Sequence, residues 1–221
     1  MKMTKSILYI TFITGVMFFI VSCDGMFDGI YDTGDSADDV TYGFKDRDAM
    51  RSSGTIYINA SSFRQWMYID FHARTVDSAE ITDDFKDPEH WDIAVHHYDV
   101  RTNGGTVMET ASADISTVAG MTHLDDSIFV GDVWTDKTVI VDISQMMSGK
   151  IGYEGSYYNT VLSRWMNVDK SQMPPTYTLS ERVYVIRMKD GTYGAVHLSN
   201  YMNVAGVKGY LTIDYVYPIN P

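Results

Sequence analysis

The chain of 221 residues contains one cysteine, Cys23, so it cannot form an internal disulfide bond. Basic residues are also scarce: 17 Lys and Arg stand against 29 Asp and Glu, which gives a formal net charge of −12 at pH 7. Nucleic acids and anionic membrane surfaces are bound by clusters of Lys and Arg. We therefore expect neither of them to be a partner of this protein.

Sequence motifs of the common enzyme classes are missing as well. The chain has no G-x-S-x-G, no H-E-x-x-H, no Walker loop and no G-x-G-x-x-G. The histidines show no metal-ligand spacing, and we interpret each as a structural residue: His72, His90, His96, His97, His123 and His197. The sequence therefore predicts a protein that is not an enzyme.

The N-terminus has the pattern of a bacterial lipoprotein signal. Lys2 and Lys5 precede an apolar run, residues 7–21, that is too short and too N-terminal to indicate a transmembrane helix. A lone cysteine directly after such a run is typical of a lipobox. We expect residues 1–22 to be a signal peptide and Cys23 to carry the lipid that holds the protein at the bilayer. The alternative is an ordinary cleaved signal with an incidental cysteine.

The segment that follows, residues 24–53, is acidic and rich in Gly, Ser and Asp, a composition typical of flexible linkers. We predict that 23–53 comprises the lipidated cysteine and a tether, and that 54–221 is one domain. An acidic stretch after a lipidated cysteine also resembles the surface-export signal of Bacteroidetes lipoproteins. A plain solvated linker is the equal alternative.

Strand patterns dominate from Gly54 onward. Apolar and polar residues alternate in short segments, as in strands that bury one face: 55–59, 66–71, 139–143, 183–188, 193–198 and 210–217. Asp190-Gly191, between two of these segments, predicts a hairpin turn. In residues 91–105, the alternation of 91–98 predicts a half-buried strand, and Thr102-Asn103-Gly104-Gly105 predicts a sharp turn.

The remaining segments are less regular. Residues 74–90 carry mixed charge and Pro88 and are expected to form a loop, while 144–149 has turn or short helical character. The apolar period of 156–166 predicts one short helix. The expected fold is a single all-β domain with one or two short helices.

Methionine is frequent, with 14 residues in the chain. We interpret Met166, on the apolar side of the expected helix, as a flexible gap-filler of the core. Met146, Met147 and Met173 differ, because they lie beside turn residues or Pro174-Pro175. A thioether is a neutral, soft ligand suited to haem iron, so two loops that each present a methionine are able to hold a haem. On spacing alone, core packing remains the alternative.

The sequence of residues 91–105 (WDIAVHHYDVRTNGG) resembles the signature of the HmuY family, haem-binding lipoproteins of Bacteroidetes. Further segments resemble family segments in the same order: MMSGKIGY (146–153), VLSRWM (161–166), MPPTYT (173–178), VYVIRMKDGTYG (183–194) and KGYLTIDYVYP (208–218). Together they cover nearly all of 54–221, and the combination is specific although each piece is weak. The resemblance implies a single-domain, hand-shaped all-β fold that holds one haem between extended loops.

Members of this family differ in their haem ligands. The best-known member uses two histidines, while relatives from Bacteroides and related genera use methionines. The resemblance implies that Met146 and Met173 are the axial ligands here, with Met147 as the substitute for Met146. Aromatic residues near these segments are expected to cover the porphyrin faces, with ordinary core packing as the alternative: Tyr153, Trp165 and Tyr177, and also Tyr157 and Tyr158. Lys150 or Arg164 is a candidate partner of the haem propionates.

The resemblance also implies a function. The protein would be a haemophore-like lipoprotein of the outer membrane, exposed at the cell surface, and the sequence leaves open whether it is also shed. It would take haem (iron protoporphyrin IX) from host haemoproteins and pass it to a TonB-dependent outer-membrane receptor, for iron acquisition. The alternative is a surface adhesin or glycan-binding lipoprotein without haem. The sequence leaves open the redox state of the preferred haem, the binding of other tetrapyrroles, the identity of the receptor and the oligomeric state.

Overall fold

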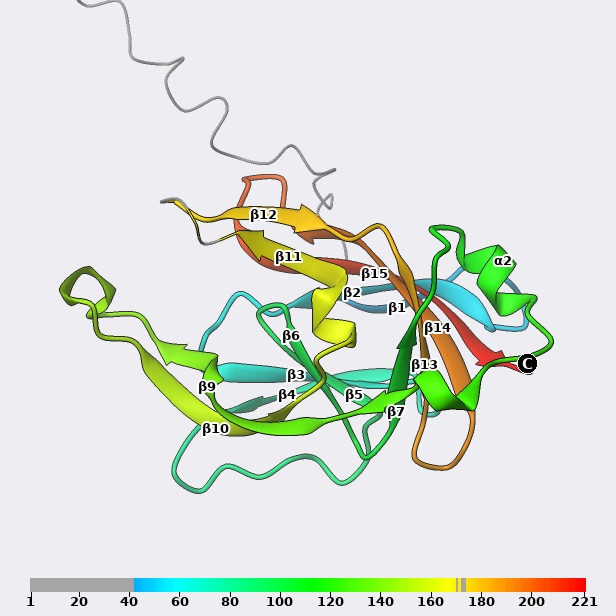
Figure 1. Cartoon of the computed structure of the whole chain (residues 1–221), viewed down its shortest axis with the longest axis horizontal. Coiled ribbons are helices and arrows are strands. Elements are labelled where there is room, and N and C mark those ends of the chain that lie inside the picture. Colours follow the sequence, from blue (N-terminus) through cyan, green and yellow to red (C-terminus); the bar gives the residue numbers. More distant parts are fainter. Residues whose placement is uncertain (1–41, 170, 172–173) are drawn as a thin grey trace, which may run out of the picture. The chain divides into compact units, whose positions relative to one another are not determined.

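The structure, a computed structural model, describes residues 42–169, 171 and 174–221, which lie within one compact unit, Thr33–Pro221. These residues form an all-β fold, as expected, with a seven-stranded sheet, a four-stranded sheet and two two-stranded hairpins (Figure 1). Helical structure in these ranges is limited to α2 (Ile115–Ala119) and three 3-10 turns: η1 (Asp126–Ile128), η2 (Met146–Ser148) and η3 (Leu162–Trp165). No helix of the described part is long and apolar enough to cross a membrane.

The seven-stranded antiparallel sheet contains most of the predicted strands. Its order is β1 (Gly43–Asp46), β2 (Ser53–Asn59), β15 (Lys208–Ile219), β14 (Tyr193–Met202), β13 (Val183–Arg187), β7 (Thr106–Glu109) and β8 (Val130–Gly131). The predictions for 55–59, 183–188, 193–198 and 210–217 are confirmed by β2, β13, β14 and β15. Gly191, at φ +90°, lies in the predicted turn between β13 and β14.

β1 lies inside the segment that was predicted to be a flexible tether. Its residues pair with residues 54–57 of β2, and Phe44 packs against the core, with its ring centroid 5.3 Å from that of Tyr215. This pairing satisfies backbone groups and partly buries an aromatic side chain. Ordered structure therefore begins before residue 54. The polar composition of 42–53 did not indicate the short edge strand that forms there.

The four-stranded sheet has the order β4 (Thr75–Glu80), β3 (Gln65–Asp70), β5 (Ile93–His96) and β6 (Asp99–Thr102). β3 confirms the strand predicted at 66–71. The loop predicted at 74–90 is wrong for β4. This strand is at the sheet edge and only Val76 and Ala79 are partly buried, so it lacks the apolar alternation of an inner strand.

Residues 91–105 depart from the expected single strand. The chain reverses at His97-Tyr98, with His97 at φ +59°, so that His96 pairs with Asp99 in a tight hairpin of β5 and β6. The predicted turn at the end of this stretch is confirmed, since Gly104 at φ +73° lies between β6 and β7. The chain therefore forms two strands where the alternation predicted one.

β5 is also buried on both faces rather than on one. Ile93 and Val95 belong to the main core, whereas Ala94 belongs to a second cluster together with Trp91 and Val139. Val139 comes from the β9–β10 hairpin. The half-buried prediction is wrong because this hairpin adds a further layer over the second face of β5.

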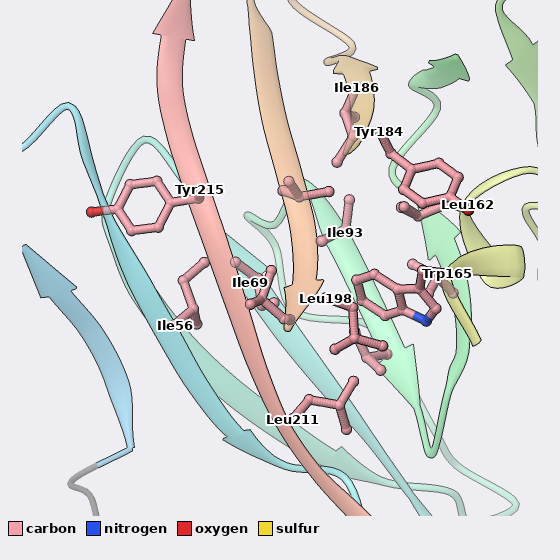
Figure 2. Close-up of a cluster of buried hydrophobic side chains, with 14 of the residues drawn as sticks. Ile56, Ile69, Ile93, Leu162, Trp165, Tyr184, Ile186, Leu198, Leu211 and Tyr215 are labelled. Carbon is pink, nitrogen blue, oxygen red and sulfur yellow. The ribbon is translucent and has the colours of Figure 1, made fainter. Parts of the chain in front are cut away.

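The main core lies between the two sheets. Figure 2 shows Ile56 and Leu211 of the seven-stranded sheet directed into the same cluster as Ile69 and Ile93 of the four-stranded sheet. Trp165 of η3 belongs to the same cluster and is fully buried. Burial of each such aliphatic side chain contributes about 1.5–3 kcal/mol. This core therefore fixes the position of η3 relative to both sheets.

Two hairpins extend from this body: β9 (Val133–Asp142) with β10 (Gly152–Tyr158), and β11 (Met166–Asp169) with β12 (Thr176–Leu179). Both project toward the same side in Figure 1. β9 and η2 confirm the strand predicted at 139–143 and the turn at 144–149. The helix predicted over 156–166 is wrong, because β10 runs to Tyr158 and only the single 3-10 turn η3 follows. The apolar period arises because this one turn inserts Leu162 and Trp165 into the core.

Candidate functional site between two hairpins

Met146 and Met147 lie in η2, the turn at the end of the β9–β10 hairpin. The Gly149 N–H closes the turn by donating to the Met146 carbonyl over 2.9 Å, and Gly149 takes φ +72°, a conformation that costs glycine little. The side chains stay accessible, with 42% of Met146 and 96% of Met147 exposed. The alternative explanation, that these two methionines pack in the core, is therefore wrong. Their thioethers are able to contact a ligand without any change in the core.

Met173 lies outside the described residues. The strands on either side of it are described, and β11 pairs with β12 from Met166 opposite Leu179 to Asp169 opposite Thr176. Met166 is buried in the main core, as predicted. The connection that contains Met173 therefore joins two strands with a defined register.

Exposed apolar side chains gather on the β9–β10 hairpin. More than half of the large apolar residues that are exposed in the described part belong to it: Val133, Trp134, Ile143, Met146, Met147, Ile151, Tyr153 and Tyr157. Single exposed apolar residues are ordinary on protein surfaces, but a group of this size on one two-stranded element is typical of a binding surface. The hairpin is thus the main candidate to contact an apolar ligand.

The aromatic residues predicted near the methionines occupy different environments. Tyr153 is exposed on β10. Tyr177, on β12, is partly buried, with its ring centroid 6.2 Å from that of Tyr201 and the Lys208 Nζ 3.7 Å above it. Trp165 is fully buried and its indole N–H donates to the Tyr98 carbonyl over 2.9 Å. Tyr153 and Tyr177 therefore offer surface near the hairpins, whereas Trp165 packs within the protein.

The remaining predicted residues differ in exposure and in their partners. Tyr157 is exposed near the base of the β9–β10 hairpin, and Tyr158 is partly buried, which raises the pKa of its hydroxyl. Arg164 pairs with Glu109 over 2.8 Å, so this cation already has a partner. Lys150, directly after η2, is exposed.

Asn159 connects the two hairpins to the body, and sequence reasoning missed it. Its side-chain oxygen accepts from the backbone N–H groups of Val161 and Leu162, at 3.1 and 2.8 Å, and fixes the start of η3. Its amide nitrogen donates to the Val130 carbonyl at 3.1 Å and to Asp132 Oδ1 at 2.9 Å. Asparagine at the start of a helical turn is a common cap, and this was the available signal.

The same connection is bound to β6. The Asn159 N–H donates to the Val100 carbonyl over 2.7 Å, and the Val100 N–H donates to Ser163 Oγ over 2.8 Å. Trp165 adds its bond to Tyr98, in the turn before β6. The stretch 91–105 therefore holds the segment from which both hairpins extend, although it contributes neither methionine.

The histidines at the β5–β6 turn are structural, as predicted. His96 is buried with its Nε2 at 2.9 Å from the Phe63 carbonyl. His97 packs against Phe63, with ring centroids 4.5 Å apart, and burial lowers the pKa of His97 to about 4. Burial lowers the pKa of His96 as well, so the neutral form of both rings is favoured.

His72 belongs to a charged group that spacing along the chain did not reveal. Its Nδ1 lies 3.2 Å from Asp92 Oδ2 and its Nε2 lies 2.8 Å from Asp190 Oδ2, while Asp70 lies close by. Partial burial lowers the pKa of His72, but the hydrogen bonds and charges of the two partners outweigh this effect and raise it. In its protonated form the ring bridges two carboxylates and ties three separate segments together.

Comparison with known proteins places the chain in a family. A family model described as the HmuY protein matches residues 62–215. A protein of Bacteroides vulgatus, provisionally described as a HmuY-like heme-binding protein, has a crystal structure with a TM-score of 0.76. It is 53% identical, and the match covers 81% of this chain and 99% of that one. A provisionally described lipoprotein of Bacteroides fragilis is 45% identical, with coverage of 81% and 97% and a TM-score of 0.76.

More distant structures share the fold. The apo HmuY analog of Tannerella forsythia is 23% identical, with coverage of 74% of this chain and 94% of that one and a TM-score of 0.62. The comparison with curated proteins produced no match. The family model spans more than half of the chain, and two solved structures are similar over most of it. The chain belongs to the HmuY family.

Proposed function

We propose that this protein binds haem between the β9–β10 and β11–β12 hairpins, with Met146 and Met173 as axial ligands and Met147 as the substitute for Met146. One observation carries the proposal: accessible thioethers lie at the end of a hairpin that bears more than half of the large apolar side chains exposed in the described part of the chain. The names of relatives support it, because a structure 53% identical to this chain is described as HmuY-like and heme-binding.

The residues present fit such a group. Porphyrin is a large apolar disc, and exposed apolar side chains gain free energy when a ligand of this kind covers them. Methionine sulfur is a neutral, soft donor that raises the reduction potential of haem iron. Tyr153 and Tyr177 lie on the two hairpins and supply aromatic surface for the porphyrin faces.

The proposed setting is the bacterial surface. Residues 1–22 would act as signal peptide, and the acylated Cys23 would anchor the domain in the outer membrane, exposed at the cell surface. The protein would collect haem from host haemoproteins and deliver it to a TonB-dependent receptor, without catalysis. The description of the Bacteroides fragilis relative as a lipoprotein supports the anchor.

The test is a haem titration of the purified protein followed by visible absorption, under oxidising and under reducing conditions. Met146→Ala, Met147→Ala and Met173→Ala are compared with the parent. Met50→Ala is the matched control, because Met50 is exposed outside both hairpins, on the connection between β1 and β2. We expect a saturable Soret change that is weakened about tenfold or more by Met173→Ala and by one of the other two, but not by Met50→Ala.

Two results would change the proposal. Equal binding by all of the methionine variants would move the ligands elsewhere in the chain. Absence of saturable binding in both redox states would overturn haem binding and favour a colourless surface interaction protein that uses the apolar hairpin as its contact face.

A further inference from the structure

A hollow of about 510 Å³ lies at the base of the β9–β10 hairpin, away from η2. Tyr157, near the end of β10, forms part of its lining, and Trp134 of β9 lies opposite Tyr157 in the hairpin register. A strand advances about 3.3 Å per residue, so this base is roughly 25 Å from the methionines in η2. The hollow is therefore separate from the proposed haem site.

One wall of the hollow is the Asn103-Gly104-Gly105 turn, which the proposed haem site does not use. Gly104 takes φ +73°, and a Cβ on Gly105 would lie 2.7 Å from the Arg187 carbonyl oxygen. Only glycine fits both requirements, so this part of the wall is bare backbone. A ligand in the hollow is able to reach peptide groups there without interference from side chains.

The lining contains hydrogen-bonding groups that the protein leaves unmatched. Arg101 is more than nine-tenths buried, and its Nη2 donates to the Tyr68 hydroxyl over 2.9 Å and pairs with Asp87. Its Nε–H and the Thr106 hydroxyl are buried, and neither has a hydrogen-bond partner among the described residues. Arg101 and Thr106 line the same hollow. Unmatched buried polar groups are uncommon in proteins and call for an explanation.

Tyr157 of the lining forms an exposed aromatic pair with Trp134, which is not itself part of the lining. Trp134 is 63% exposed and Tyr157 54% exposed, with ring centroids 5.3 Å apart at an angle of 82°. Gly155 leaves room for Trp134 to lie against the backbone, because a Cβ there would be 2.8 Å from the indole Cζ2. The two rings are thus fixed by their packing while large parts of them face solvent.

The charged groups in the lining already have ionic or hydrogen-bonding partners within the protein. Arg101 is paired with Asp87, and Asp132 accepts hydrogen bonds from the Thr102 N–H at 2.6 Å, the Thr102 hydroxyl at 3.1 Å and the Asn159 amide at 2.9 Å. A cationic ligand would meet Arg101, and an anionic ligand would meet two carboxylates on a chain of net charge −12. The hollow therefore favours a neutral ligand.

We propose that this hollow binds a neutral carbohydrate. Sugar hydroxyls donate and accept, which suits the guanidinium, hydroxyl, carboxylate and bare peptide groups of the wall. The C–H face of a pyranose ring packs on an exposed aromatic ring, the role of Tyr157, against which Trp134 packs. The volume is within the usual range for small-molecule sites. Haem binding and glycan binding would then be two properties of one protein, located at opposite ends of one hairpin.

The experiment is a screen of the purified protein on a printed array of neutral plant, animal and bacterial glycans, followed by calorimetric titration with the glycan that binds best. We expect saturable binding that falls about tenfold or more in Tyr157→Ala and in Thr106→Val. Both variants should fold, because Tyr157 is exposed and valine is close to threonine in size.

Tyr153→Ala is the matched control, since Tyr153 is an exposed aromatic residue of the same hairpin that does not line the hollow. It should leave glycan binding unchanged, and Thr106→Val should leave the haem titration unchanged. Absence of binding to every glycan on the array overturns the proposal. Binding that both Tyr157→Ala and Thr106→Val leave unaltered overturns it as well.

Discussion

The stretch 91–105 and the β9–β10 hairpin are both rich in apolar residues, yet those of the first are mostly buried and many of those of the second are exposed. Ile93, Ala94 and Val95 are fully buried, whereas Trp134 and Met147 are largely exposed. The first stretch has packing partners on both faces, including the hairpin itself through Val139. The difference shows that apolar composition does not determine burial. The first region maintains the structure, and the second leaves apolar surface exposed.

The largest expected effect is on stability, from Ile93→Ala in the buried stretch. Removal of a fully buried aliphatic side chain leaves a cavity and should lower the free energy of unfolding by about 2–5 kcal/mol. Ile143→Ala, at an exposed position of the hairpin, is the matched control and should cost less than about 1 kcal/mol. Urea unfolding followed by circular dichroism measures both. Equal losses would show that the two regions do not differ in the way described.

A smaller loss is expected from Asn159→Ala, which acts at the junction of the two regions. The substitution removes four side-chain hydrogen bonds in a buried position and should cost about 1–3 kcal/mol. Because Asn159 holds the segment between the hairpins, haem affinity should fall too, although the residue carries no predicted ligand atom. Asn167→Ala, at an exposed position of β11, is the control for both measurements. Unchanged haem affinity in Asn159→Ala would show that the anchored segment does not position the hairpins.

The next effect is pH-dependent and comes from His72. Its pKa is raised in the folded state, so its stabilisation is fully present below pH about 6.5 and is lost as the pH rises through the folded-state pKa. The difference in unfolding free energy between the parent and His72→Asn should therefore be larger at pH 6 than at pH 9. It should stay below about 1 kcal/mol, because the side chain is 44% exposed.

Urea titrations of both proteins across this pH range provide the measurement. His90→Asn is the control, because His90 is exposed and its neighbour Glu89 is exposed as well. A difference that stays constant or grows from pH 6 to pH 9 would contradict the bridging role of His72.

At the methionine end of the hairpin, we expect a change of pH to have no effect on haem ligation. Thioethers do not titrate between pH 4 and 8, so the Soret band of the haem complex should persist from pH 8 to pH 5. Met146→His introduces an imidazole and should make the same band sensitive to acid. Loss of the band near pH 5 in the parent, with an intact circular dichroism spectrum, would be incompatible with methionine ligation.

Local patterns predicted the well-paired strands in which apolar and polar residues alternate. The hairpin around Asp190-Gly191 and the strand at 210–217 were found because one face is buried and the turn residues are specific. β1 and β4 were missed, since edge strands need few apolar residues. The period of 156–166 was assigned to a helix because burial of one 3-10 turn produces the same spacing as a short amphipathic helix.

The sequence by itself determined the all-β class, the family and the presence of methionines outside regular core. These features depend on residue type and on neighbours along the chain. Only the tertiary structure decided that β15 lies between β2 and β14, that Asn159 meets Val100 and Asp132, and that Arg101 and Thr106 line one hollow. Contacts between distant residues follow from how the layers pack. Alternation along one strand does not indicate which strand lies beside it.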